Sequence, residues 1–261
     1  TSLTRAQRVN SAGALQWTAN GVAVCTDAAG QEQPIVVPAP LGGSVIAWQD
    51  NRGLAGPYAQ RLSVSGSTLW SANGVYAGIG VSGTAFYPAA VGDAAGGVTI
   101  AWSQNMVASA SYDVCLSHVN SSGGYDWAAV VCDAANDQYV QDLQRASDGS
   151  YLLAWSDSRG TTTELYAQRV APGGYPYWTD GGVAITSSAQ PYIKSFENLV
   201  PDEDGGFTLG FANGIGRDVF AQRVSATGSR RWSTSGVPVC IATGNQYPAR
   251  CLSDGAGGLF V

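Results

Sequence analysis

The sequence predicts an all-β protein assembled from a repeated unit, and three observations lead to this fold class. The 261 residues are 45% hydrophobic but only 12% charged, and they include 34 glycines, a composition typical of chains rich in strands and tight turns. Short apolar runs end at Asp-Gly or Gly-Gly pairs, which are typical of reversals between antiparallel strands. One sequence pattern also recurs along the whole chain, which indicates an internal structural repeat.

The repeat is carried by three sets of residues. The triplet Ala-Gln-Arg begins at Ala6, Ala59, Ala167 and Ala221, and the segment VCLSHV around Cys115 fills the same slot, so successive copies lie roughly 52 to 56 residues apart. A tryptophan follows each copy, at Trp17, Trp70, Trp127, Trp178 and Trp232. Another aromatic residue precedes the triplet in four units, at Trp48, Trp102, Trp155 and Phe211. Three markers with one period exclude a chance similarity.

Each unit contains four strand signals. The first is short and apolar, as in PIVV from Pro34 and PAAV from Pro88, and it ends in a turn such as GDAAGG from Gly92. The second is SVIAW from Ser44 and its copies, and the third is the YAQR segment. The fourth follows the pattern LQWTANGVAVC, in which the Asn-Gly pair indicates a β-bulge.

A repeated four-stranded unit of roughly 40 to 50 residues is typical of a β-propeller blade, whereas a β-sandwich does not repeat one consensus at one period. We expect a single propeller domain over residues 1–261. Five blades are expected near residues 31–80, 84–133, 137–186, 190–241, and 246–261 joined to 1–26. A blade shared by both ends would close the ring without an open sheet edge. The alternative is a piece of a longer array, because the chain opens at Thr1 rather than Met and its final GGLFV stops before the pattern is complete.

Charge limits the classes of partner. The formal net charge is −6 and Lys194 is the only lysine, which disfavours nucleic acid and anionic membranes. No apolar stretch reaches the roughly 20 residues of a membrane span. The chain has one histidine, His118, and no Cys-x-x-Cys pair, so we expect no structural zinc and no other cofactor. Scarce lysine and Thr-, Ser- and Gly-rich turns favour an extracellular or cell-surface protein.

The five cysteines suggest two disulfides. Cys240 and Cys251 flank a short loop where one blade meets the closing blade, so a bond between them would hold the ring closed. Cys115 and Cys132 begin the third and end the fourth strand of one blade, which would make them neighbours. Cys25 is then the odd cysteine. Reduced, buried thiols are the competing interpretation.

Charged residues also repeat after the second strand. Asp50 with Arg52, and Asp157 with Arg159, occupy equivalent positions. We expect a hydrogen-bond network that holds the turn, because every blade has the same packing problem, and repeated ligand contacts are the less favoured reading. The repeated tryptophans are expected to fill the space between adjacent blades.

A ligand site is expected where the blades differ, in the loops and first-strand residues around the mouth of the central channel. Tyr87, Tyr139 and Tyr247 occupy near-equivalent repeat positions there, and polar side chains accompany them at Gln33, Asn198 and Gln246. Aromatic faces stack on sugar rings and polar groups bind hydroxyls, so these six residues are candidate glycan contacts. Tyrosines that only pack the channel mouth are the alternative.

The pattern AW-D-RG…YAQRV…W…GV-V resembles the propeller repeats of bacterial secreted and cell-surface proteins, over nearly the whole chain. Five-bladed closure with similar blades also resembles the tachylectin-type lectins, in which sugars bind between blades. The resemblance implies an extracellular, non-catalytic binding or scaffold module for a glycan or a protein surface, and a structural subunit of a surface assembly is one alternative.

The other alternative is a glycoside hydrolase with carboxylates at the central channel. Glu32, Asp142 and Glu197 come from three different blades and could supply an acid and a base or nucleophile. Calcium is a further option, at Asp202, Glu203 and Asp204 or along residues 133–137, although neither run has the spacing of an EF-hand loop.

Overall fold

The computed structural model describes residues 3–53, 55–81, 84–106, 111–187, 195–196, 198–213, 217–247 and 250–261, without the side chains of residues 87, 195 and 196. These residues form antiparallel sheets and one three-residue helical turn, Pro40–Gly42. Within those ranges no helix is long and apolar enough to cross a membrane. The chain folds as two compact units, residues Thr1–Ala108 with Cys115–Ala129 and residues Ser109–Val114 with Val130–Val261.

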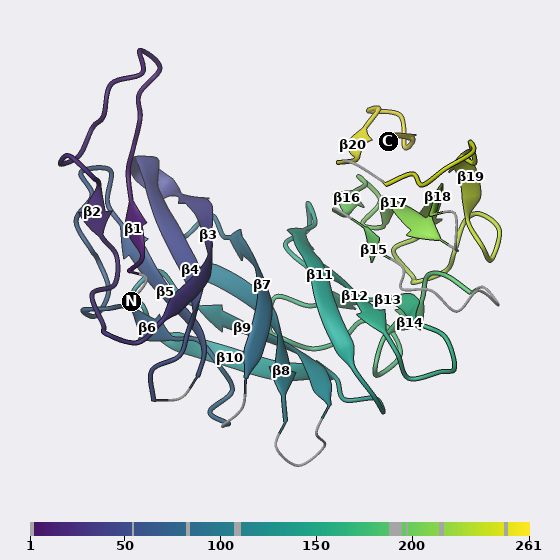
Figure 1. Ribbon diagram of the computed structural model, residues 1–261, viewed down its shortest axis with the longest axis horizontal. Coiled ribbons are helices and arrows are strands. Elements are labelled where there is room, and N and C mark those ends of the chain that lie inside the picture. Colours follow the sequence, from purple (N-terminus) through teal and green to yellow (C-terminus); the bar gives the residue numbers. More distant parts are fainter. Residues whose placement is uncertain are drawn as a thin grey trace. The chain divides into compact units, whose positions relative to one another are not determined.

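The first unit contains a four-stranded sheet, most of a second, and a two-stranded hairpin (Figure 1). The first sheet is β3 (Gln31–Ala39), β4 (Gly43–Asp50), β5 (Gly56–Leu62) and β6 (Val75–Tyr76), in that order. The second sheet is β7 (Ala85–Gly92), β8 (Val98–Asn105), β9 (Tyr112–Val119) and β10 (Tyr125–Cys132). The hairpin is β1 (Arg5–Ala6) and β2 (Val22–Ala23).

The second unit repeats this organisation. One sheet is β11 (Gln138–Arg145), β12 (Tyr151–Asp157), β13 (Glu164–Val170) and β14 (Val183–Ala184). The next is β15 (Ser195–Phe196) and β16 (Val200–Pro201), which both pair with β17 (Phe207–Asn213), followed by β18 (Asp218–Val224) and β19 (Val237–Cys240). A two-stranded sheet ends the chain, β20 (Leu252–Ser253) with β21 (Leu259–Phe260).

β4, β8, β12 and β17 are the most buried strands of their sheets. β12 and β17 are buried along their whole length. Their sequences, YLLAWSD and FTLGFAN, do not alternate between apolar and polar residues, because sheets packed on both faces leave neither side to water. The predicted all-β fold is therefore confirmed, and the strand order within each sheet is that of a propeller blade.

The sequence repeat is also a repeat of register. Ala59 of β5 lies opposite Val75, and Ala167 of β13 lies opposite Val183. In the N-terminal hairpin Ala6 lies opposite Val22 in the same way. The hairpin β1–β2 therefore corresponds to the third and fourth strands of the repeated unit, without its first and second strands.

The C-terminal sheet has the complementary form. Leu252 pairs with Phe260 and Ser253 with Leu259, as Val200 pairs with Thr208 and Pro201 with Phe207 at the start of the preceding sheet. β20 and β21 are thus first and second strands. In the described part of the chain each half remains a separate two-stranded sheet, so the five-bladed, closed ring stays a prediction.

Two aspartates at the ends of second strands, Asp50 of β4 and Asp157 of β12, are buried and hold the turn that follows each strand. Asp50 is fully buried, accepts a hydrogen bond from Trp48 Nε1 at 2.8 Å, and pairs with Arg52 at 2.9 Å. Arg52 also donates to the carbonyl of Asn73 on the turn that precedes β6. The network predicted for these residues is confirmed, and it engages both carboxylate oxygens of Asp50 within the protein.

The same corner recurs in the second unit and includes a cysteine. Asp157 accepts from Trp155 Nε1 at 2.8 Å and pairs with Arg159 at 2.6 Å. Cys132 Sγ lies 3.0 Å from Arg159 Nη2, as Cys25 Sγ lies 3.7 Å from the equivalent arginine nitrogen in the first unit. The predicted Cys115–Cys132 disulfide is therefore wrong: Cys132 is a thiol packed into this corner.

The tryptophans of the fourth-strand segments join neighbouring sheets, as predicted. Trp70 Nε1 and Arg61 Nη1 both donate to the carbonyl of Ser121, each at 3.0 Å. Trp17 Nε1 donates in the same way to the carbonyl of Val64 at 3.1 Å. We call this arrangement, an arginine and a tryptophan on one carbonyl of the next sheet, the Arg–Trp latch.

One slot of the repeat was misassigned from the sequence. His118 of β9 bonds Asp93 at 2.9 Å, as Arg223 of β18 bonds Asp202 at 3.2 Å. His118 therefore occupies the arginine position of the triplet, which places Leu116, not Cys115, in the alanine position. The divergent sequence of this strand concealed the shift of one residue.

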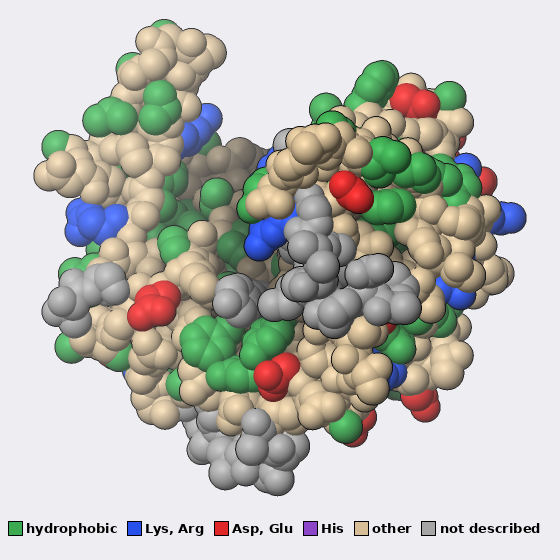
Figure 2. Space-filling view, turned by 45° about the vertical axis from the view of Figure 1, so that its right-hand side comes forward, with side chains coloured by type: hydrophobic (Ala, Val, Ile, Leu, Met, Phe, Trp, Pro, Cys, Tyr) green, Lys and Arg blue, Asp and Glu red, His purple; other side chains and the backbone are tan. Residues whose placement is uncertain are grey.

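Charged side chains are sparse on the surface. On the face drawn in Figure 2, lysine and arginine side chains are scattered rather than gathered into one patch.

Candidate functional site

Asp142 is the predicted hydrolase residue whose surroundings the structure describes most fully. It lies on β11 just after a bulge that shifts the register between Val140 and Asp142. Its half-buried carboxylate accepts a hydrogen bond from the backbone N–H of Leu199 at 2.7 Å and from Gln144 Nε2 at 2.9 Å. The bulge thus directs the carboxyl group toward the first strand of the following sheet.

Burial raises the pKa of the Asp142 carboxyl above its ordinary value, because a charge in a poorly solvated site is disfavoured. Hydrogen bonds from Gln144 and Leu199 and the positive charge of Arg250 oppose the shift without cancelling it. A carboxyl group with a raised pKa retains its proton closer to neutral pH and can donate it as a general acid.

Asn198 makes the same contact one sheet further along. Its Oδ1 accepts from the backbone N–H of Cys251 at 2.8 Å, and its Nδ2 donates to the Cys251 carbonyl at 3.0 Å. An uncharged amide therefore ties one first strand to the next. Because an amide makes this contact at position 198, the fold does not require a carboxyl group at position 142.

A second carboxyl group with a raised pKa was not found from the sequence. Asp113 of β9 is buried, and its Oδ1 has no hydrogen-bond partner among the residues that the structure describes. Burial together with the charge of Asp133 raises the pKa of Asp113 to about 6. The only sequence signal was a carboxylate inside an otherwise apolar strand.

Two of the predicted ligand tyrosines have partners within the protein. The Tyr139 hydroxyl donates to Asp137 Oδ2 at 3.1 Å, and its ring lies 5.3 Å from that of Tyr112. Tyr247 is 60% exposed, and the guanidinium of Arg217 lies 4.7 Å from its ring centre. Tyr139 therefore packs at the end of its strand, whereas Tyr247 keeps an accessible ring.

The remaining predicted residues are dispersed. Glu32 is exposed on β3 in the first unit, and the neighbouring Gln33 has a positive φ of 50° at the bulge in that strand. Gln246 donates to the carbonyl of Gly244 at 2.6 Å. Glu197 and the side chain of Tyr87 lie outside the described residues. Asp142 and Asn198 are thus the pair that the structure places in equivalent roles.

The predicted Cys240–Cys251 disulfide is not formed. Cys251 is buried, its backbone is held by Asn198, and its Sγ lies so near Gly210 that a Cβ there would approach within 2.9 Å. Cys240 pairs with Val219 at the end of β19. Both are thiols in the structure.

The acidic runs considered for calcium are used otherwise. Asp202 and Asp204 face Arg223, at 3.2 and 3.7 Å. Over the described ranges, no group of three or more His, Cys, Asp or Glu side chains is arranged to hold a metal ion.

Comparisons with known proteins give structural neighbours only. No protein-family model matches the chain, and no curated protein matches its sequence. A protein of unknown function from Dyadobacter fermentans has 11% identity and a TM-score of 0.52 over 78% of this chain and 68% of that one. A Penicillium chrysogenum α-L-arabinanase complexed with arabinobiose has 12% identity and a TM-score of 0.49 over 80% and 69%. A glycosyl hydrolase from Bacteroides ovatus has 11% identity and a TM-score of 0.46 over 81% and 72%.

These findings correct the main functional prediction. The sequence favoured a non-catalytic binding or scaffold module, but two of the named structural neighbours are described as an arabinanase and a glycosyl hydrolase, and neither is described as a lectin or a scaffold protein. The physical reason for the error is that similar blades suggested equivalent sites, whereas the first strands carry different groups, a carboxyl at Asp142 and an amide at Asn198.

Proposed function

We propose that the chain is a glycoside hydrolase domain in which Asp142 is the general acid. The observation that supports this most directly is the raised pKa of a half-buried carboxyl group in a slot where the following sheet uses an amide. In the proposed reaction, Asp142 donates its proton to the glycosidic oxygen as the bond to the sugar breaks.

Such a reaction needs a second carboxylate, as base or nucleophile. Glu197, adjacent to Asn198 in the sequence, is our proposal for it. The separation of the two carboxyl groups would determine the stereochemical outcome, about 5–5.5 Å for retention and about 6.5–9.5 Å for inversion.

The test compares the wild type with Asp142→Asn on arabinosides, mannosides, xylosides and glucosides, each with an alkyl or a 2,4-dinitrophenyl leaving group. We expect kcat to fall by about 10²–10⁴-fold on alkyl glycosides, where the leaving oxygen needs a proton. On dinitrophenyl glycosides, whose leaving group departs as a stable anion, the loss should be much smaller. The high-pH limb of the rate profile should also disappear.

Asp142→Asn is a well-matched variant, because Asn198 shows that an amide supports the same backbone tie. An unchanged rate on alkyl glycosides would exclude Asp142 as the acid. Equal losses on both leaving groups would assign it a role in binding or folding instead.

The architecture that we propose for this function is a single five-bladed ring, with β20–β21 and β1–β2 joined in the fifth blade. By analogy with β17 and β18, where Phe207 lies opposite Val224, Leu259 would lie opposite Val9. Asp254 would then face Arg8, as Asp202 faces Arg223. We also propose that the protein works outside the cell on a glycan, consistent with its scarce lysine.

A further inference from the structure

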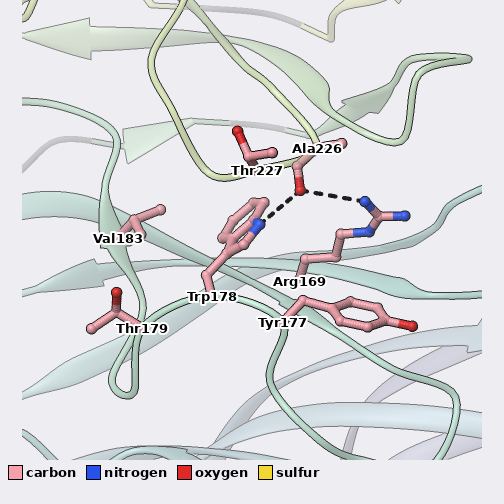
Figure 3. Close-up of a pocket in the computed structure, with 7 residues that line it drawn as sticks. All are labelled: Arg169, Tyr177, Trp178, Thr179, Val183, Ala226 and Thr227. Atoms are coloured by element: carbon pink, nitrogen blue, oxygen red, sulfur yellow. Dashed lines mark hydrogen bonds between the residues drawn. The ribbon is translucent and has the colours of Figure 1, made fainter.

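A pocket lies between two neighbouring sheets of the second unit (Figure 3). It has a volume of about 570 Å³ and is lined by the Arg–Trp latch of Arg169 and Trp178, by Tyr177 and Thr179 beside them, and by Thr227 on the turn of the next sheet. These residues belong to third and fourth strands and their turns. The pocket is therefore separate from Asp142, which lies on a first strand.

The polar groups of the latch are already engaged. Trp178 Nε1 donates to the carbonyl of Ala226 at 2.9 Å (Figure 3). Arg169 donates to the same carbonyl at 3.3 Å, to Ser150 Oγ at 2.9 Å and to the Asp148 carboxylate. The cation is thus neutralised by Asp148, and each of its three nitrogens donates a hydrogen bond within the protein, which disfavours an anionic ligand in this pocket.

The groups that stay accessible are an aromatic ring and hydroxyls. Tyr177 is 55% exposed, and the guanidinium of Arg169 lies 5.3 Å from its ring centre. Thr179 and Thr227 also line the pocket, and the Thr227 hydroxyl shares a hydrogen bond of 3.0 Å with Ser225 Oγ. A flat ring beside hydroxyls suits a neutral ligand that has both an apolar C–H face and hydroxyl groups, which is the chemistry of a saccharide ring.

The scaffold does not require this tyrosine. The backbone N–H of Tyr177 bonds the Arg169 carbonyl at 2.7 Å, as the N–H of Leu69 bonds Arg61 at 2.8 Å and that of Gln16 bonds Arg8 at 2.9 Å. The three residues therefore occupy one slot beside three equivalent latches. Leucine and glutamine fill it elsewhere, so the exposed ring at position 177 is not explained by folding.

We infer that this pocket binds one neutral sugar unit of a saccharide chain, with Tyr177 as the stacking ring. The site goes beyond the proposed catalytic role of Asp142 and does not depend on it. It would hold a polysaccharide to the domain away from the reacting bond.

The test is affinity electrophoresis of the whole chain in gels that contain soluble arabinan, xylan, galactomannan or β-glucan. The variants are Tyr177→Leu, which introduces the residue found in the equivalent slot, and Tyr175→Leu as the control. Tyr175 is 75% exposed but does not line the pocket. We expect at least one polysaccharide to retard the wild type, Tyr177→Leu to weaken binding about tenfold or more, and Tyr175→Leu to bind like the wild type.

Three outcomes would overturn the inference: no retardation by any of the four polysaccharides, equal binding by the two tyrosine variants, or binding of a proline-rich peptide in the pocket without any polysaccharide. Thermal unfolding of Tyr177→Leu shows whether its fold is intact. Asp142→Asn in the same gels separates the two proposals, because it should lose hydrolysis and keep retardation.

Discussion

Asp142 and Asn198 hold the first strands of consecutive sheets by the same hydrogen bond. Each side-chain oxygen accepts the backbone N–H of a residue in the next first strand, Leu199 at 2.7 Å and Cys251 at 2.8 Å. One of the two residues is a carboxylic acid with a raised pKa, and the other is an amide. The same structural hydrogen bond is therefore made by an ionisable residue at position 142 and by a neutral one at position 198.

Loss of the hydrogen bond between Asp142 and Leu199 should lower the free energy of unfolding more than loss of the carboxylate charge. Asp142→Ala leaves the N–H of Leu199 without its partner and should lower the free energy of unfolding by about 1–3 kcal/mol. Asp142→Asn retains an acceptor and should be as stable as the wild type or more stable at neutral pH, because no charge is buried. Urea unfolding of the two variants at pH 7 measures the difference, and equal losses would contradict the assigned contact.

Asp113 should make stability depend on pH. Its pKa is about 6 in the folded chain, above its ordinary value of 3.8, so the folded state binds more protons than the unfolded state between those values. Stability should therefore fall as the pH rises from about 4 to about 6, by up to about 3 kcal/mol. Urea unfolding at several pH values should show a smaller fall in Asp113→Asn, and an unchanged slope would exclude Asp113 as its source.

Gly228, in the turn that packs against the Arg–Trp latch of Arg169 and Trp178, should be needed both for its positive φ and for its closeness to the Trp178 ring. Gly228 has a φ of +82°, and a Cβ there would lie 3.0 Å from the ring of Trp178. Gly13 occupies the equivalent turn with a φ of +80°, and a Cβ there would meet none of the described residues within 4 Å. Gly13→Ala should cost about 1 kcal/mol from backbone strain, and Gly228→Ala about 1–3 kcal/mol more from crowding. Denaturant midpoints of the two variants test this, and equal costs would argue against the latch contact.

The thiols should react at different rates. Burial raises the pKa of Cys132 to about 11, and Arg159 and Asp157 surround its sulfur. A disulfide-exchange reagent at pH 8 should therefore label the partly exposed Cys240 first and Cys132 slowly in the folded chain. In urea, without reductant, all five cysteines should react. Labelling of fewer than five cysteines in urea would indicate that the chain contains a disulfide.

Ring closure can be tested by cross-linking. Cysteines introduced as Val9→Cys and Leu259→Cys should form an intramolecular disulfide, because the proposed register places them opposite each other. Leu15→Cys with Leu259→Cys is the control, since Leu15 lies across the hairpin from Val9. Peptide mapping by mass spectrometry identifies the products. Links only between separate chains, or equal yields in both pairs, would contradict the shared blade.

Repetition made much of the fold predictable. Ala59 and Ala167 recur at one period, and the structure gives them equivalent partners, Val75 and Val183. Where the repeat diverged, the prediction slipped by one residue, because only the bond between His118 and Asp93 shows which residue takes the arginine position. The cysteine pairings failed for a related reason: sequence proximity does not show that Cys132 points at Arg159.

The amino-acid sequence by itself determined the all-β class, the four-stranded unit and the hydrogen-bond network of Asp50 with Arg52 and of Asp157 with Arg159, because the short apolar runs, the turn glycines and the repeat period are local features of the chain. Tertiary structure decided which carboxyl groups have raised pKa values and where an aromatic ring stays accessible. Desolvation of Asp142 and exposure of Tyr177 depend on what the neighbouring sheet places against them, and this packing is not encoded in the residues adjacent to them in the chain.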